Sequence, residues 1–403
     1  MKEKITGTAT YSSIKIEENK IIEFKRTNSV MNSFRVLKDG YLGVHYQEGD
    51  IADDIGYARA EENLVLKRPY KFGHETGKRH RDKTEKELTD KELMELAEEA
   101  LEYIQTKYPD FTFKGNVSRN ATFMSMTNSS GLDYSNRDQT VNIDISFKHR
   151  DSKDITDGWF GIGMRDFDIQ KFYDMADNYL SNFTNEVPLP DEIIVQMQYY
   201  SLLGKLHESL DAEKMCLGTS LLSGKIGEKI FAENFNLVHD VSDKECWHTM
   251  FFDGEGVTVE NDILPFIENG VLLRGYSDKK VADKYGVEHT GSANATLSDI
   301  PSNGNVNLRI TRSDKTIKEL LDGRMTVIPV RYSGGGFNDK GEYTMPVQMA
   351  YLCDDEKILG RLPEFTLVSS MFDMFGDDFI GVGSDDPIFN DKQILVRMKL
   401  GKT

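Results

Sequence analysis

Alternating hydrophobic and polar positions dominate the first fifty residues and predict antiparallel strands. Ile14 and Ile16 alternate with polar neighbours, and further on Asp39-Gly40 separates two strand-like stretches. An Asp-Gly pair between such stretches is a strong signal for a two-residue β-hairpin. From Lys78 to Lys86 the pattern gives way to a run of charged residues. We interpret this run as a connector.

The pattern then changes to the spacing of amphipathic helices. Apolar residues recur at helical intervals from Leu93 to Ile104, and Thr89 with Glu92 precedes them as a capping box. A second helical pattern covers residues 168–183. Between the two, Val141–Phe147 alternates strictly, as expected for a half-buried strand. The first half of the chain is therefore predicted to combine an antiparallel sheet with two amphipathic helices.

Two prolines in Val187–Pro190 interrupt regular structure and mark the predicted domain boundary. After them we expect a strand and a single helix from about Tyr199 to Glu213, followed by glycine-rich β-structure. The sequence thus predicts a two-domain α+β fold. Residues 1–188 form an α+β domain, and residues 189–403 form a domain that is mostly β, with one helix.

Composition narrows the function classes. The chain has 403 residues and a net charge of −18, from 67 acidic and 49 basic residues. Such a charge repels nucleic acid and anionic membranes, so we expect neither as a partner. No stretch approaches the ~20 apolar residues of a membrane span, and the opening segment has no apolar core of a signal peptide. We expect a cytoplasmic protein. Cys216, Cys246 and Cys353 show no CxxC spacing, which disfavours a disulfide framework and a four-cysteine zinc site.

The pair His207-Glu208 is the most suggestive candidate for chemistry. In zincin-type peptidases a helical histidine binds zinc and the neighbouring glutamate activates the metal-bound water. The second histidine would follow four residues later, where this chain has Asp211. On one continuous helix Asp211 would share a face with His207 and could offer an oxygen ligand. One hypothesis is therefore a rearranged zinc site on His207, Glu208 and Asp211, and the other, which we favour, is a solvated pair without metal.

Three glycines form a second candidate site. Gly334, Gly335 and Gly336 follow a strand-like stretch, and glycine lets a backbone approach another chain closely. This property suits a cleft that binds a peptide through main-chain hydrogen bonds, and it suits an ordinary wide loop equally well. Cys246 and His248 form a C-x-H pair, which we interpret as a buried thiol beside a polar strand residue.

Several ordered motifs resemble those of the TldD/PmbA family, whose members are also called modulators of DNA gyrase. They are GTSLLSGKIGE at 218–228, FDGEGV at 252–257, IENGVL at 267–272 and ADKYGVEHTGSA at 282–293. The resemblance covers nearly the whole chain. It implies a two-domain α+β fold and a complex in which a zinc-bearing subunit pairs with a metal-free one. Such a complex degrades unfolded peptides in an enclosed cavity.

The resemblance also implies which type of subunit this chain is. The zinc-bearing type has the signature H-E-x-x-x-H and a cysteine near its carboxyl end. His207 and Glu208 match the first two positions, but the second histidine is replaced by Ala212, and no cysteine follows Cys353. We therefore expect the metal-free PmbA/TldE type, with no catalytic or metal-binding residues of its own. Zinc would sit in a TldD-type partner of a homo- or hetero-oligomer that acts on peptides.

Three hypotheses follow: a non-catalytic peptidase subunit, an active metallopeptidase with a rearranged site, and a peptide-binding scaffold without a peptidase partner. The second could also draw oxygen ligands from Asp385 or Asp386, although oxygen-rich sites suit harder ions than zinc. We further expect the helix that bears His207 to lie next to Gly334–Gly336, with both lining one cleft.

Overall fold

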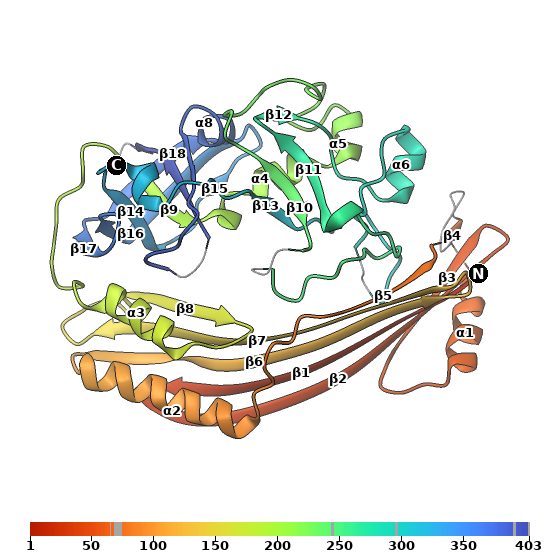
Figure 1. The fold of residues 1–403 in the computed structure, drawn as a ribbon, viewed down its shortest axis with the longest axis horizontal. Coiled ribbons are helices and arrows are strands. Elements are labelled where there is room, and N and C mark those ends of the chain that lie inside the picture. Colours follow the sequence, from red (N-terminus) through yellow and green to blue (C-terminus); the bar gives the residue numbers. More distant parts are fainter. Residues whose placement is uncertain (65, 68–74, 243–245, 295–296, 390–391, 402–403) are drawn as a thin grey trace.

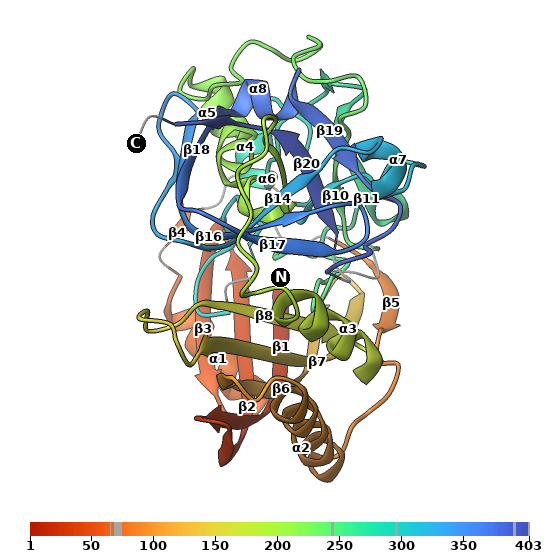
Figure 2. The same cartoon turned by 90° about the vertical axis from the view of Figure 1, so that its left-hand side faces the viewer.

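The architecture is α+β with a two-domain arrangement, as the sequence predicts. A computed structural model describes residues 1–64, 66–67, 75–242, 246–294, 297–389 and 392–401. These residues form sheets of eight, four and nine strands and eight α-helices. Among the described strand pairs only β5–β7 and β9–β14 are parallel, which excludes a doubly wound parallel sheet. In both views the long strands of the first sheet lie beneath the second half of the chain (Figures 1 and 2).

The first sheet has the order β4-β3-β2-β1-β6-β7-β5, and β8 pairs with β7 beyond β5. The predicted hairpin at Asp39-Gly40 is confirmed, because Lys38 of β2 pairs with Tyr41 of β3. Both turn residues have positive φ, 54° and 78°, as a two-residue turn between twisted strands requires. The strands are β1 (Lys2–Glu17), β2 (Lys20–Lys38), β3 (Tyr41–Glu48), β4 (Leu66–Lys67), β5 (Gly77–Asp82), β6 (Phe111–Asn128), β7 (Leu132–His149) and β8 (Gly158–Met164).

The predicted connector at Lys78–Lys86 is wrong in its first part, since Gly77–Asp82 forms β5. This edge strand pairs through its backbone, so it carries no hydrophobic alternation for sequence reasoning to detect. Its charges reach the second half of the chain instead of water. Arg79 hydrogen-bonds the carboxylate of Asp262 at 2.8 Å, and Arg81 donates to the Val241 carbonyl at 2.7 Å.

Three helices belong to the first half: α1 (Asp53–Glu62), α2 (Asp90–Lys107) and α3 (Ile169–Leu180). The capping box of Thr89 and Glu92 is confirmed at the start of α2. The apolar faces of α2 and α3 pack into a core with Phe147 and Phe160, and this core also takes in Val330 and Tyr351 from the second half. None of the helices in the described residues has both the length and the apolar composition needed to cross a bilayer.

The second half is mostly strand, as predicted, but the prediction of a single helix is wrong. Its described residues form five α-helices of five to seven residues each: α4 (Gly204–Ser209), α5 (Ala212–Cys216), α6 (Lys279–Tyr285), α7 (Ile317–Leu321) and α8 (Met371–Phe375). Helices this short span fewer than two turns, so they leave too few repeats for a periodic signal. Residue 188 lies between α3 and β9, and the division into 1–188 and 189–403 stays a prediction.

The second half contains the other two sheets. The four-stranded sheet has the order β12-β11-β10-β13, and the nine-stranded sheet has the order β19-β20-β9-β14-β16-β18-β21, with β15 and β17 paired to β16. The strands are β9 (Ile194–Gln198), β10 (Leu237–Asp240), β11 (Ile263–Glu268), β12 (Val271–Leu272), β13 (Leu308–Ile310), β14 (Thr326–Tyr332), β15 (Gly336–Phe337), β16 (Glu342–Cys353), β17 (Ile358–Leu362), β18 (Phe365–Ser370), β19 (Phe379–Val382), β20 (Gln393–Arg397) and β21 (Lys399–Leu400).

Candidate functional site

The helix predicted from Tyr199 to Glu213 is broken in the middle. α4 ends at Ser209, and α5 begins only at Ala212. Asp211 between them has an extended backbone, and its carboxylate accepts a hydrogen bond from the Glu213 amide at 2.9 Å as the N-cap of α5. His207 and Asp211 therefore do not share one helical face. The break has a local cause, because a capping aspartate stabilises a new helix start better than a continued helix.

The other members of the predicted site are engaged in structural contacts. The carboxylate of Glu208 forms ion pairs with Lys205 at 2.9 Å and with Lys214 at 3.1 Å, and these contacts lower its pKa. A carboxylate so stabilised in its charged form is a weak general base. The ring of His207 lies against the ring of Tyr276, with centroids 5.1 Å apart.

This arrangement does not fit a zinc ion. Asp211 also accepts from the side-chain amide of Asn303 at 3.1 Å, and Ala212 has no donor atom. In the described residues one group of three His, Cys, Asp or Glu side chains lies close enough to share a cation, and it lies elsewhere. The oxygen-ligand alternatives are also occupied, since Asp386 pairs with Arg312 at 2.6 Å and Asp385 accepts from the Ile317 amide at 2.7 Å.

The glycine segment lies where β15 begins. Gly334, Gly335 and Gly336 all have positive φ, and a Cβ on Gly335 would lie 2.4 Å from the Thr344 carbonyl oxygen of β16. Glycine is thus required by the close approach of the chain's own neighbouring strand, as in an ordinary loop. Binding of a peptide here, and the predicted contact between this segment and the helix that bears His207, stay predictions.

The structure instead reveals a cavity of about 850 Å³ between the first sheet and the second half of the chain. Trp159 of β8 and Trp247, the chain's two tryptophans, both line it. They are 53% and 40% exposed, so much of each indole is available for contact. Tyr200, Arg309 and Asp386 line the opposite side from the second half. An aromatic lining with dispersed charges suits a peptide-like ligand.

The strand β8 exposes one polar face to this cavity. Asp144 of β7 pairs with Gly161, and Asn142 pairs with Gly163. A Cβ on Gly161 would lie 2.5 Å from a carboxylate oxygen of Asp144, and a Cβ on Gly163 would lie 2.3 Å from the amide oxygen of Asn142. The two glycines therefore give these polar side chains room at the cavity. Glycine at alternate positions of a strand-like stretch is the signal that could have located this site from the sequence.

A buried ion pair holds the segment that carries Trp247. The guanidinium of Arg165 contacts the carboxylate of Asp138 at 2.7 Å, and both side chains are at most 5% exposed. Arg165 also donates to the Cys246 carbonyl at 2.6 Å and lies over the Trp247 ring at 4.7 Å. The His248 amide donates to Asp138 at 2.8 Å. The C-x-H pair is therefore part of a turn at the cavity, and its interpretation as a strand segment is wrong.

His248 and His239 face a smaller cavity of about 240 Å³ that shares Thr249 and Asn307 with the larger one. His248 has a left-handed backbone, with φ of 55°, and Thr122 and Thr140 contact its ring at 2.8 and 2.9 Å. Burial lowers the pKa of His248, and it lowers the pKa of His239 to about 4. The two imidazoles are therefore neutral at pH 7.

His239→Asn should make the protein less sensitive to acid. The folded-state pKa of His239 lies below its ordinary value of 6.5, so its contribution to stability is complete above pH 6.5 and is lost as the pH falls toward 4. Asparagine preserves an acceptor for the Asn307 amide, which donates to Nδ1 of His239 at 2.9 Å. Between pH 7 and 5 the wild type should lose about 2 kcal/mol more unfolding free energy than the variant.

Urea denaturation at the two pH values measures this difference. The control is His80→Asn, because the side chain of His80 is 59% exposed and should leave the pH dependence unchanged. Equal losses in wild type and His239→Asn would contradict the assignment.

Comparison with known proteins identifies the family. The model of the PmbA/TldA metallopeptidase C-terminal domain matches residues 193–395, just over half of the chain. The chain belongs to the TldD/PmbA family. The resemblance found in the sequence motifs is thereby confirmed, whereas its assignment to the metal-free type is not tested by this match.

Relatives and solved structures agree with this family. An uncharacterised protein of Methanocaldococcus jannaschii is 25% identical over 378 residues, which cover 90% of this chain and 87% of that protein. TldE from Thermococcus kodakarensis has a TM-score of 0.77 at 18% identity. A Thermotoga maritima protein named for modulation of a DNA gyrase has a TM-score of 0.78 at 21% identity. Each structural match covers 99% of this TldD/PmbA chain and 96% of the other, and it confirms the fold.

Proposed function

We propose that this chain is a non-catalytic subunit of PmbA/TldE type in a metallopeptidase complex that acts on unfolded peptides. It would pair with a zinc-bearing TldD-type subunit. The observation that carries the proposal is the state of the predicted zinc position. Glu208 is held by two lysines, Asp211 caps α5, and Ala212 provides no donor.

The charge pattern around Glu208 supports this assignment. A general base of a zinc peptidase needs a carboxylate that faces the metal-bound water and takes up its proton. Here Lys205 and Lys214 both hold that carboxylate in its charged form. A cation placed beside them would also be repelled by two ammonium groups. The local charges therefore favour a site that has turned from metal binding to a structural role.

The large cavity supports a role in handling peptides. Trp159 and Trp247 offer exposed aromatic surface. Asn142 and Asp144 add polar groups along the same wall. Extended peptides pair with such surfaces through apolar side chains and main-chain hydrogen bonds.

Reconstitution tests the catalytic part of the proposal. The purified chain alone should not hydrolyse an unfolded fluorogenic protein substrate, with or without added zinc. Ala212→His alone should also be inactive, because a second histidine still lacks the third donor. Mixing the chain with a zinc-bearing TldD-type relative should give chelator-sensitive hydrolysis. Hydrolysis by the chain alone that is abolished by Glu208→Gln would instead establish the rearranged-site hypothesis.

Tryptophan fluorescence tests the peptide-binding part. Since both tryptophans line the cavity, titration with unfolded peptides should change the emission of the whole chain. The matched control variants, Trp159→Phe and Trp247→Phe, each retain one reporter and should each report the same binding curve. A wild-type spectrum that unfolded peptides leave unchanged, together with no activation of the TldD-type subunit, would contradict the proposal. Peptide binding without such activation would favour the scaffold hypothesis.

A further inference from the structure

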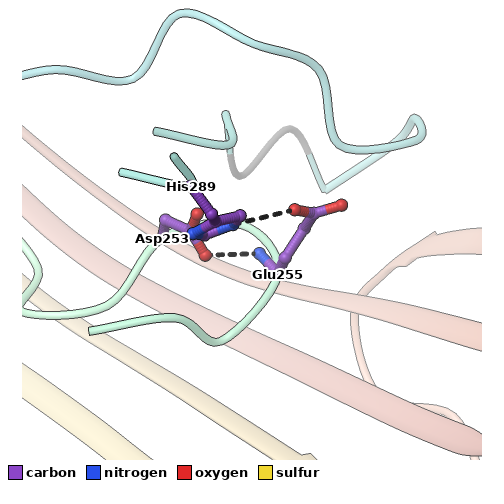
Figure 3. Close-up of side chains that lie close together, drawn as sticks. All are labelled: Asp253, Glu255 and His289. Atoms are coloured by element: carbon purple, nitrogen blue, oxygen red, sulfur yellow. Dashed lines mark hydrogen bonds and ion pairs between the residues drawn. The ribbon is translucent and has the colours of Figure 1, made fainter. Parts of the chain in front are cut away.

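A second cluster of ligand-type side chains lies far from α4 in the sequence and is buried. Asp253, Glu255 and His289 each offer one oxygen or nitrogen atom, and these atoms lie within 4.8 Å of one another. Figure 3 shows the three side chains converging from two segments, the turn that precedes β11 and the stretch after α6. Three such groups at this separation match the spacing of protein ligands around a single cation.

The turn that carries the two carboxylates is held rigidly. One oxygen of Asp253 accepts from the amides of Glu255 and Val257 at 2.8 and 2.9 Å. Its other oxygen accepts from the Ala293 amide at 3.0 Å, which ties the turn to the segment that follows His289. The cluster is therefore preorganised by backbone contacts that do not depend on a ligand.

The independent observation that points to a ligand is the state of Glu255. Its side chain is fully buried, and Oε2 accepts from the Lys279 amide at 3.0 Å. Oε1 has no hydrogen-bond partner among the described residues, and neither does Nε2 of His289. Nε2 lies 3.8 Å from Oε2 of Glu255, which is beyond hydrogen-bond length. A buried carboxylate oxygen without a partner is destabilising unless something fills its site.

The charges around the cluster also leave it short of cations. The buried Arg35 pairs with the buried Glu3 at 3.0 Å and donates to the Gly254 carbonyl at 2.6 Å. Lys279 directs its ammonium to Glu75 at 2.6 Å. Both neighbouring cations are thus already paired with other carboxylates, so Asp253 and Glu255 have no lysine or arginine partner within the described residues.

We propose that Asp253, Glu255 and His289 bind a divalent transition-metal cation of the zinc or manganese type. Two carboxylates and one imidazole are ligands that such ions accept, and their negative charge would be balanced by the ion. The smaller cavity is lined by Asp253 and Gly291 and gives the ion a way in. Binding through Nε2 places the ring proton on Nδ1, so the contact of 3.2 Å from the Gly291 amide to Nδ1 is given up.

The bound ion would join the 253–257 turn to the 289–293 segment. This site is separate from the position of His207, so it requires no restored H-E-x-x-x-H signature. It would place a metal in a chain whose family position for zinc lacks the donors. The proposal is therefore independent of the proposed function, and metal analysis of the whole protein alone cannot separate the two positions.

Metal titration of matched variants makes the separation. The full chain is freed of metal with a chelator and titrated with Zn²⁺, Mn²⁺ and Mg²⁺ by calorimetry, and the metal retained after gel filtration is counted. We expect about one Zn²⁺ per chain, and affinities that fall from Zn²⁺ to Mn²⁺, with Mg²⁺ weakest. His289→Ala and Glu255→Gln should each weaken Zn²⁺ binding at least about tenfold, whereas His207→Ala should leave it unchanged.

His289→Ala decides the result if Glu255→Gln fails to fold, because the His289 side chain is 23% exposed. Circular dichroism confirms the fold of each variant. A wild type that binds none of the three ions, or equal Zn²⁺ binding by wild type and His289→Ala, would overturn the site. Loss of Zn²⁺ only in His207→Ala would overturn it as well, and it would contradict the proposed function at the same time.

Discussion

Asp138→Ala is expected to lower the free energy of unfolding by about 3–5 kcal/mol. The variant leaves Arg165 buried without its counter-charge, since Asp138 is its ion-pair partner and neither side chain reaches the surface. It also removes the acceptor of the His248 amide. The segment that carries Trp247 would lose one of its anchors, so the indole emission should shift as well. Urea denaturation followed by circular dichroism and by fluorescence measures both effects.

A neighbouring pair on the same strand provides the control. Arg137 pairs with Glu87 at 2.8 Å, but both side chains are more than half exposed. Glu87→Ala should therefore change the unfolding free energy by no more than about 1 kcal/mol. Equal losses in the two variants would show that burial does not set the strength of the Asp138–Arg165 pair.

The effect of Asp138→Ala should also depend on pH. Burial alone would raise the pKa of Asp138, but the hydrogen bonds and charge of Arg165, with the His248 amide, lower it overall. A lowered folded-state pKa means that this contribution is present above the ordinary pKa of an aspartate, about 4, and is lost as the pH falls through the folded-state value. The difference between wild type and variant should shrink in strong acid.

Phe147→Ala should destabilise the protein by about 3–5 kcal/mol, because it leaves a cavity in the core that both halves share. Phe147 is 1% exposed, and its ring lies 5.9 Å from those of Phe111 and Phe160 and 5.7 Å from that of Phe183. A Cβ on Gly158 would touch both Phe147 and Val330 of β14 at 2.8 Å. The residue thus packs where the first sheet meets the second half.

Thermal unfolding followed by two probes measures this effect. Both far-ultraviolet circular dichroism and tryptophan emission should show one shared transition at a lower temperature. Phe24→Ala is the control, since Phe24 is 42% exposed on β2 and its removal leaves no core cavity. A transition of the second half that stays at the wild-type temperature in Phe147→Ala would show that the halves unfold independently.

Local sequence signals were reliable where the interaction itself is local. The Asp39-Gly40 turn and the Thr89–Glu92 capping box depend on residues within four positions of each other, and both are confirmed. The helix from Leu93 to Ile104 followed from a periodicity long enough to be read. The family, too, could be recognised from ordered motifs without a structure, because those motifs are contiguous in the chain.

The sequence failed where a distant contact decides the outcome. β5 is a strand because it pairs with β7, about fifty residues away, and its own residues show only charge. The predicted helix over His207 breaks because Asp211 caps α5, and the Ala212 amide there donates to the Tyr276 carbonyl at 3.0 Å. The exposed pair that looked catalytic is held by lysines, a fact that only side-chain positions can show.

The sequence by itself determined the α+β class, the family and the absence of a donor at Ala212, because composition, periodicity and motif order are properties of the chain alone. Only the tertiary structure brought Trp159 and Trp247 to one cavity, and placed His289 beside Asp253 and Glu255. Those groups are up to 88 residues apart in the sequence, and no local pattern encodes which distant backbone segments meet. The physical reason is that packing of the two halves sets these distances, whereas the sequence fixes only the side chains that are available.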